Sequence, residues 1–219
     1  MTLTELKQRY DDMQKQYGDP SLGSIHFGGC MNRPDVCFVF MNPTGKNISA
    51  QPDWQGIRAP WIGTKSIWDL YYMIGKFDDS LYREIKRRKA DEWTPDFARS
   101  VYDEIARNRL FFTNLGKCTL MGAKPVSDRV YAAYLPLLEQ EISLIDPKAV
   151  VLFGNQVSTV FLHQTIAVTR CRRQHYFKTI GGKTYSCYPV CYPVGNGRVN
   201  LGKAAEDLRW LFGRIENSR

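Results

Sequence analysis

Two asparagines follow apolar segments at positions where their side-chain amides could do chemistry. In CFVFMNPTGKN (37–47) the apolar run ends at Asn42-Pro43, and in RLFFTNLGKC (109–118) it ends at Asn114. An apolar run closed by turn-forming residues predicts a buried strand whose end opens into a loop. Amides carry a donor and an acceptor on one flat group, so two of them at one site could read the edge of a nucleobase. The alternative is that each asparagine only satisfies the backbone of its own turn.

A parallel sheet would bring these two asparagines together. Strands beginning near residues 36, 110, 149 and 185 alternate with helical patterns, which predicts an α/β fold, a three-layer α/β/α sandwich with a mostly parallel central sheet. Ligands bind at the carboxyl edge of such sheets. We expect that edge, polar but almost uncharged, to collect Asn42, Asn114, the turn Gly154-Asn155 and the loop 192–198. The predicted helices cover 3–17, 66–76, 79–90, 95–107, 127–145, a segment after Gly154 and 201–219, and a hairpin turns at Gly181-Gly182.

The segment 42–65 is too long for a simple connection in a compact domain. It contains Trp54 and Trp61 among several prolines and glycines. Loops of this length are usually functional. The basic run in 81–93, by contrast, is typical of a solvated helix face.

The composition favours a polyanionic partner. Lys plus Arg number 30 against 22 Asp plus Glu, which gives a formal charge of +8 and a pI near 9.2. Such a charge suits DNA, although an ordinary basic protein has the same balance. We expect one domain over 1–219, a monomer, a cytoplasmic location and no membrane partner, since no apolar run approaches the ~18 residues of a membrane span. Six cysteines without a CxxC motif predict reduced thiols and no metal site.

Several short motifs resemble the uracil-DNA glycosylase superfamily, in the same order and over most of residues 36–210. FMNPT (40–44) resembles the Gly-Met-Asn-Pro-Gly motif of single-strand-selective uracil-DNA glycosylases. The segment at Pro60-Trp61 resembles a loop whose aromatic residue stacks on the extruded base, and TNLGKC (113–118) resembles the segment whose asparagine binds the pyrimidine edge. YPVGNGR (192–198) is similar to the His-Pro-Ser motif, whose loop enters the DNA minor groove and ends on arginine. PLLEQEISLIDPKAVVLFGNQV (136–157) resembles the four-iron cluster-bearing families.

The resemblance implies a monofunctional DNA glycosylase that flips out a modified or deaminated base and hydrolyses its N-glycosidic bond. Asn42 would hold the water, Asn114 the base edge, Trp61 the stacking face and Tyr192 the leaving base. Trp61 could instead be plain core packing, and the basic hairpin after residue 169 a solvated surface. The other implied contacts are Phe40, Met41 and Pro43 with the base, and Lys46, Arg170, Arg172, Arg173, His175, Lys178, Gly195, Asn196 and Arg198 with DNA.

The sequence departs from the family pattern at four places. Phe40 and Thr44 stand where the first motif has glycines, which remodels the pocket wall. Tyr192 replaces a histidine and can donate a hydrogen bond but cannot carry positive charge. Cys118 falls on a cluster position, whereas Tyr134 stands where the fourth cysteine would be. We therefore expect no iron–sulfur cluster and no other cofactor.

Three alternatives remain for the function. The remodelled pocket and the long loop 45–63 suit a bulky base, so an antiviral glycosylase removing glucosylated hydroxymethylcytosine from phage DNA is one reading. A non-catalytic reader of damaged or single-stranded DNA would keep Trp61 and the basic residues without needing Asn42 to hold water. A nucleotide-binding protein would carry a glycine-rich phosphate loop, which MNPTGKN (41–47) does not match.

Overall fold

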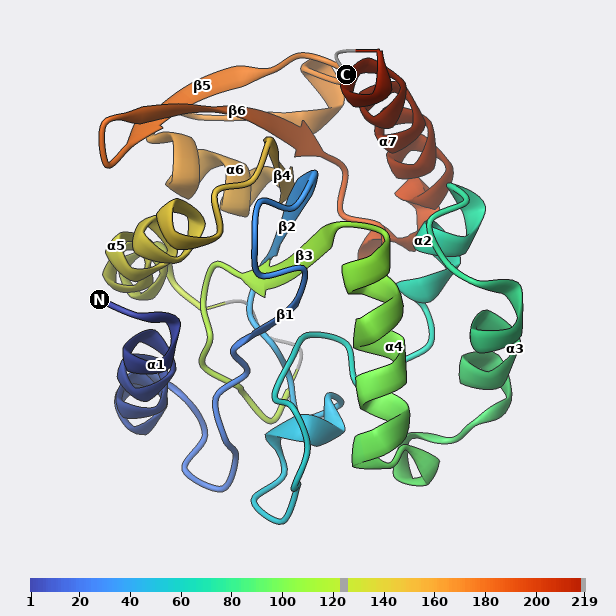
Figure 1. Ribbon diagram of the computed structural model, residues 1–219. Coiled ribbons are helices and arrows are strands. Elements are labelled where there is room, and N and C mark those ends of the chain that lie inside the picture. The colour runs from blue at the N-terminus through green and yellow to red at the C-terminus, as the bar shows by residue number, and fades with distance from the viewer. Residues whose placement is uncertain (123–125, 218–219) are drawn as a thin grey trace.

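The central feature of the structure is one six-stranded sheet in the order β1-β3-β2-β4-β6-β5. The computed structural model describes residues 1–122 and 126–217 (Figure 1). The four inner strands are parallel and the two edge strands antiparallel, which confirms the mostly parallel sheet expected from the sequence. The strands are β1 (Phe27–Gly29), β2 (Val36–Phe40), β3 (Leu110–Asn114), β4 (Ala149–Phe153), β5 (Tyr176–Ile180) and β6 (Lys183–Val190).

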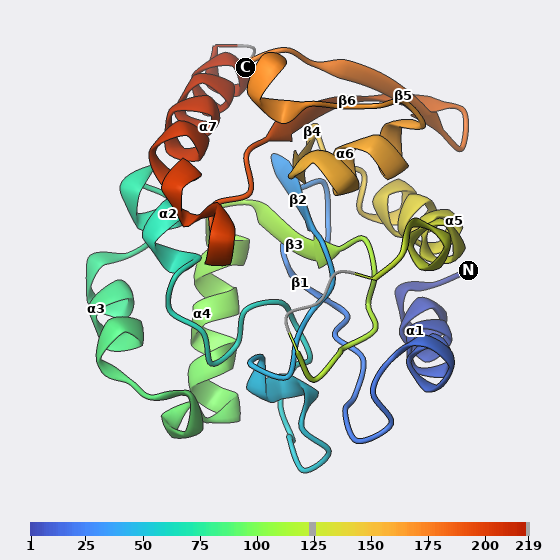
Figure 2. The same cartoon turned by 180° about the vertical axis from the view of Figure 1, so that it is seen from behind.

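Helices cover both faces of the sheet, as Figures 1 and 2 show from opposite sides. Each face has its own buried apolar cluster, and this confirms the three-layer α/β/α sandwich. Two helices are shorter than the sequence predicts. The helix expected over 66–76 ends before Ile74, and the helix expected over 79–90 ends before Arg88. One face carries α1 (Leu3–Tyr17), α5 (Asp128–Ile145) and α6 (Asn155–Leu162), and the other α2 (Trp68–Met73), α3 (Asp79–Arg87), α4 (Pro95–Arg107) and α7 (Leu201–Glu216). The predicted last helix ran to 219, and its final two residues lie outside the described residues.

Strand β2 is apolar throughout because both of its faces are covered. Its alternate residues Val36, Phe38 and Phe40 enter the cluster under α2, α4 and α7, while Cys37 and Val39 enter the cluster under α1 and α5. A strand buried on both sides reads as a continuous apolar run rather than an alternating one. The chain therefore leaves the core only after the end of β2, and Asn42 follows there.

The register between β2 and β3 places the two asparagine-bearing loops side by side. Phe40 pairs with Asn114, and the pairing continues past the strands because Leu115 donates its backbone N–H to the Phe40 carbonyl at 2.7 Å. Gly116 donates in the same way to the Met41 carbonyl at 3.1 Å. Both loops thus leave the sheet at its carboxyl edge.

The long loop after β2 is folded on itself by Asn47, which the sequence did not single out. The buried Asn47 side chain donates from Nδ2 to the Ala59 carbonyl at 2.8 Å and accepts at Oδ1 from the Ser49 backbone at 3.1 Å. A short 3₁₀ turn, η1 (Ile48–Ala50), lies between these contacts. The loop therefore returns to the sheet edge at Pro60 and Trp61.

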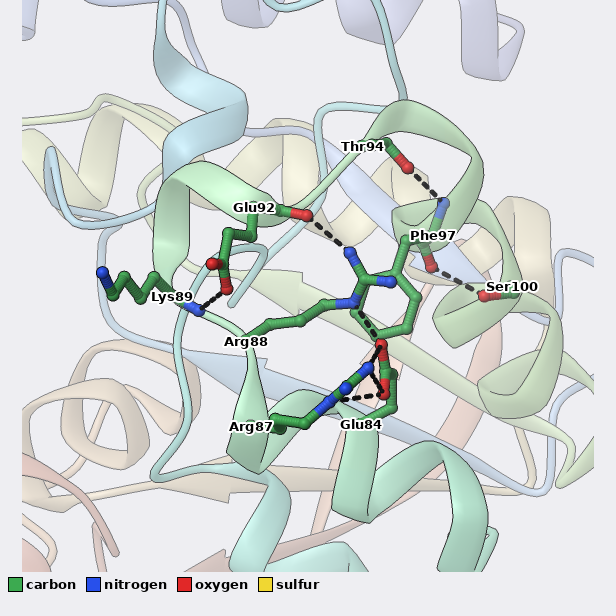
Figure 3. Close-up of polar contacts among 8 residues, drawn as sticks. All are labelled: Glu84, Arg87, Arg88, Lys89, Glu92, Thr94, Phe97 and Ser100. Carbon is green, nitrogen blue, oxygen red and sulfur yellow. Dashed lines mark hydrogen bonds and ion pairs between the residues drawn. The ribbon is translucent and has the colours of Figure 1, made fainter.

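Part of the basic run at the end of α3 is paired with carboxylate and carbonyl groups of the same segment (Figure 3). Arg87 and Arg88 both pair with Glu84, at 2.7 and 2.8 Å. Arg88 also donates to the Glu92 carbonyl at 2.7 Å, and Thr94 caps the start of α4. These contacts lie where α3 ends and α4 begins.

Across the described ranges, no helix has both the length and the apolar character that a bilayer crossing requires.

Candidate active site

A cavity at the carboxyl edge of the sheet contains both asparagines. Its volume is about 370 Å³ when the open space at its mouth is included. The loop after β2, the end of β3 and the loop after β6 supply its described walls, whereas the turn Gly154-Asn155, which was expected at the same place, is not among the lining residues. Its lining residues are Asn42, Pro43, Thr44, Asn47, Pro60, Trp61, Thr64, Asn114 and Tyr192.

The Asn42 side chain is held in a defined orientation. Its Oδ1 accepts a hydrogen bond from the Tyr131 hydroxyl at 2.8 Å, and its Nδ2 donates to the Pro43 carbonyl at 3.2 Å. Tyr131 comes from α5, far along the chain, and nothing in the sequence pattern marks it as a partner of Asn42.

Asn114 presents a buried donor at the cavity wall. Its side chain is almost fully covered, and Nδ2 has no hydrogen-bond partner in the described part of the chain. A buried amide donor without a partner costs about 1–3 kcal/mol, so a ligand that accepts a hydrogen bond there would relieve this cost. The backbone carbonyl of Asn114 accepts from the Lys117 ammonium at 2.7 Å, which fixes the main chain at this point.

Trp61 forms the aromatic wall, and Phe40 lies behind it. The Trp61 backbone has φ of 72°, an unusual value for a side chain of this size. Its ring packs edge-on against Phe40, with 5.1 Å between centroids and 81° between planes. Phe40 itself is buried and stacks on Phe153 at 4.9 Å. The structure thus corrects the expected base contact of Phe40, because this residue supports Trp61 from the core. Met41 is likewise displaced from the expected position, since it packs on the opposite apolar cluster.

Tyr192 contributes a neutral phenol side chain to the cavity lining. Burial raises the pKa of Tyr192 to about 12, so its hydroxyl keeps its proton throughout the physiological range. The chain passes close to it at Gly197, where an added Cβ would lie 2.2 Å from the Tyr192 carbonyl oxygen. Among the described residues, the lining includes no carboxylate and no cation, and these residues offer amides, hydroxyls and an indole. This set can bind a flat, neutral, polar ring.

Most of the arginines and lysines expected to bind DNA are already paired with carboxylates. Arg172 and Arg173 both contact Glu206 and Asp207, Arg198 contacts Asp69 at 3.1 Å, and Lys178 contacts Glu139 at 2.8 Å. These pairings offset part of the positive charge that DNA would meet, and the expected DNA contacts of these four residues stay predictions.

Two expected cations, by contrast, have no such partner. Lys46 and Arg170 are exposed and form no ion pair within the described residues. Gly195 and Asn196 are exposed at the start of the 3₁₀ segment η4 (Gly195–Asn200). The same segment presents Val199, which is 86% exposed and which the sequence analysis did not select.

The cysteine expected at a cluster position lies in the core. Cys118 is buried in the same apolar cluster as Tyr134, and burial raises the pKa of its thiol to about 11. Among residues 1–122 and 126–217, no three His, Cys, Asp or Glu side chains are grouped so that they could hold a metal ion. Cys118 therefore remains a protonated thiol in this arrangement.

The fold and cavity together define an α/β/α protein with a pocket lined by amides, hydroxyls and an indole at the carboxyl edge of its sheet. The family description "Uracil DNA glycosylase superfamily" matches residues 31–209, a span that includes every cavity residue. The chain belongs to this superfamily, whose members are generally DNA glycosylases. No curated protein matches the chain.

Proposed function

We propose that this protein is a monofunctional DNA glycosylase, which takes a modified or deaminated base out of the DNA stack and hydrolyses its N-glycosidic bond. The observation that carries this proposal is the shared cavity, in which Asn42, Asn114 and Trp61 meet although they lie far apart in the sequence. The product is an abasic site in an otherwise intact strand. Uracil is the first candidate base, because the family is named for it.

Recognition of the base would use Trp61 and Asn114. A base inside the duplex does not expose its sugar carbon to water, so it must first leave the stack. Leaving the stack costs free energy, and stacking on Trp61 would offset roughly 1–3 kcal/mol of it. The unpartnered Nδ2 of Asn114 would then donate to a carbonyl on the base edge, and Pro43 and Pro60 would close the sides.

Bond cleavage would use Asn42 and Tyr192. Asn42 Oδ1 would accept a hydrogen bond from a water molecule and orient that water toward the sugar carbon. The water oxygen forms a bond to this carbon as the carbon–nitrogen bond breaks, and the bonding electrons leave with the base. The proton that the water loses passes to solvent or to the departing anionic base. Tyr192 would donate its hydroxyl hydrogen bond to the departing anionic base, a contact that strengthens as the charge develops.

Replacement of Tyr192 by phenylalanine should slow base release by about 100-fold, because one neutral donor to the developing anion is lost. The pKa of Tyr192 is raised to about 12, so the proton stays on the hydroxyl below that pH. The ratio of wild-type to Tyr192→Phe rates should therefore stay constant between about pH 6 and about pH 10, the span over which a histidine or an unperturbed tyrosine would titrate. Single-turnover rates at several pH values measure it, and a ratio that changes across this span would contradict the neutral-donor role.

Binding of DNA should depend on Lys46 and Arg170 more than on the paired arginines. For duplex DNA, each phosphate contact contributes about 0.9 to the slope of log affinity against log salt. The double variant Lys46→Gln/Arg170→Gln should therefore lower that slope by nearly two such contributions, as measured by fluorescence anisotropy at several salt concentrations. The control variant is Arg173→Gln, whose guanidinium already faces Glu206 and Asp207. An equal loss of slope in this control would contradict the assignment.

Base release from defined oligonucleotides tests the function itself. The panel should contain uracil, deaminated purines and glucosylated hydroxymethylcytosine, followed by alkali to cut abasic sites and by mass spectrometry of the released base. The cavity is open at its mouth, which favours glucosylated hydroxymethylcytosine as a second candidate, since a bulky substituent can extend outward. Tight binding without release from any member would reject the glycosylase and select a non-catalytic DNA reader.

A further inference from the structure

The main chain at Asn114 is held by a buried lysine. Lys117 follows three residues later, and its ammonium donates a hydrogen bond to the Asn114 backbone carbonyl at 2.7 Å. The same ammonium donates to the Thr113 hydroxyl, so it contacts the last two residues of β3. The Lys117 side chain is inaccessible to solvent, and Asn114 belongs to the cavity lining. A buried charge thus contacts the residue whose amide is assigned to the base edge.

Glu141 on α5 holds the ammonium in place. Its carboxylate is inaccessible to solvent and lies 3.2 Å from the Lys117 nitrogen. It accepts a further hydrogen bond from the Tyr10 hydroxyl at 2.7 Å, and another from the Thr113 hydroxyl. Tyr10 belongs to α1, which lies beside α5 in both views of the fold (Figures 1 and 2). The end of β3 is therefore tied to two helices through one ion pair.

We propose that Lys117 and Glu141 form a positioning pair for base recognition, which holds Asn114 in the orientation that its amide needs at the cavity wall. This inference rests on the proposed glycosylase function. Neither residue of the pair belongs to the described lining of the cavity, so the pair would act on a bound base only through Asn114.

The peptide group between Asn114 and Leu115 is fixed through both of its polar atoms. Its carbonyl oxygen accepts from Lys117, and its N–H donates to the Phe40 carbonyl of β2 at 2.7 Å. Because a peptide group is planar, these two contacts fix its orientation and with it the direction in which the Asn114 side chain leaves the backbone. Stability is a weak explanation for the ion pair, since apolar residues in place of a buried pair are often equally or more stable.

Replacement of the pair by apolar residues separates positioning from stability. Lys117→Met/Glu141→Leu leaves neither charge of the pair buried, so this variant should keep the fold. The probe is a duplex with one 2′-fluorinated deoxyuridine mispaired with cytosine, in which the fluorine slows bond cleavage, and the reference duplex has 2′-fluorinated deoxycytidine at the same mispaired site. In fluorescence anisotropy the variant should lose about tenfold of the wild-type preference for the uracil duplex, the effect of one well-placed polar contact to a base. Its affinity for the reference duplex should stay at the wild-type value.

Two further comparisons make the test specific to Asn114. Tyr10→Phe removes a hydroxyl from Glu141 but keeps the ring over the ammonium and the contact of Lys117 with the Asn114 carbonyl, so the preference should stay near wild type. In an Asn114→Ala background, removal of the pair should cause no further loss, because the two changes affect the same contact. The proposal would be overturned by a wild-type preference in Lys117→Met/Glu141→Leu, by an equal loss in Tyr10→Phe, or by a further tenfold loss in the Asn114→Ala background.

Hydrogen exchange gives a readout that does not need DNA. The Leu115 N–H belongs to the peptide group that Lys117 holds, and it should exchange about tenfold faster in Lys117→Met/Glu141→Leu than in wild type. This change should exceed any change at Val151 in β4, which reports on the stability of the whole sheet. Unchanged exchange at Leu115 overturns the positioning role whatever the affinities. Equal affinity of the wild-type protein for the two duplexes would instead reject the recognition of uracil, and exchange at Leu115 would then decide whether the pair fixes Asn114.

Discussion

Replacement of Asn42 by alanine should reduce the single-turnover rate of base release by about 100- to 1,000-fold, the loss typical of one well-placed polar group at a reacting centre. The reason is that Asn42 Oδ1 is held by Tyr131 at the cavity wall and would orient the attacking water. Affinity for the substrate should change little, because base recognition is assigned to Asn114 and Trp61. Rates with enzyme in excess over a modified oligonucleotide measure the effect.

Asn155→Ala is a suitable control for Asn42→Ala. Asn155 also lies at the carboxyl edge of the sheet, where its Oδ1 accepts from the Val168 backbone at 2.9 Å, but it does not line the cavity. This variant should keep most of the activity. Unchanged turnover in Asn42→Ala would remove Asn42 from the mechanism, and loss of binding with an unchanged rate would assign it to recognition instead.

Replacement of Glu141 by leucine should destabilise the protein by about 3–5 kcal/mol, because it leaves a buried ammonium without its carboxylate. Lys117 and Glu141 are both inaccessible to solvent and lie 3.2 Å apart. The Tyr10 hydroxyl donates to Glu141 at 2.7 Å, and Thr113 contacts both charged groups. Burial lowers the pKa of Lys117, and the adjacent carboxylate opposes that shift. Urea unfolding followed by tryptophan fluorescence measures the loss.

Two further variants separate the charge effect from simple loss of packing. Lys117→Met/Glu141→Leu removes both charges and should be more stable than Glu141→Leu alone, because no uncompensated ion stays buried. Asp12→Ala breaks the exposed pair with Lys15, which should cost under about 1 kcal/mol. A double variant as unstable as the single one would contradict the charge explanation.

The sequence predicted the sheet and the meeting of the two asparagines for a simple physical reason. Buried parallel strands are continuous apolar runs, and the residues that follow them share one edge of the sheet. Asn42 and Asn114 therefore had to lie near each other once their strands were neighbours, and the register of β2 and β3 shows that they are. The resemblance to the superfamily placed Trp61 and Tyr192 at the same cavity.

Pairwise contacts between distant segments could not be predicted in the same way. Charge counts do not show that Arg198 meets Asp69 of α2, or that Arg172 meets Asp207 of α7. Periodicity places Tyr131 on the inner face of α5 but does not say which side chain its hydroxyl reaches. Likewise, Phe40 directly precedes Met41 and Asn42, yet the alternation of β2 turns its ring into the core.

Asn47 has a further consequence for substrate choice. Its contacts with Ser49 and Ala59 close the long loop through the chain's own groups, so the proposed base pocket would be formed before a base enters. A preformed pocket loses little conformational entropy when it binds its ligand. Most of the free-energy cost of distortion then comes from the nucleic acid. Bases that are mispaired or already unstacked cost the least free energy to extrude from the duplex. A preformed pocket would therefore favour such bases because the duplex holds them weakly, before any contact with the base edge forms.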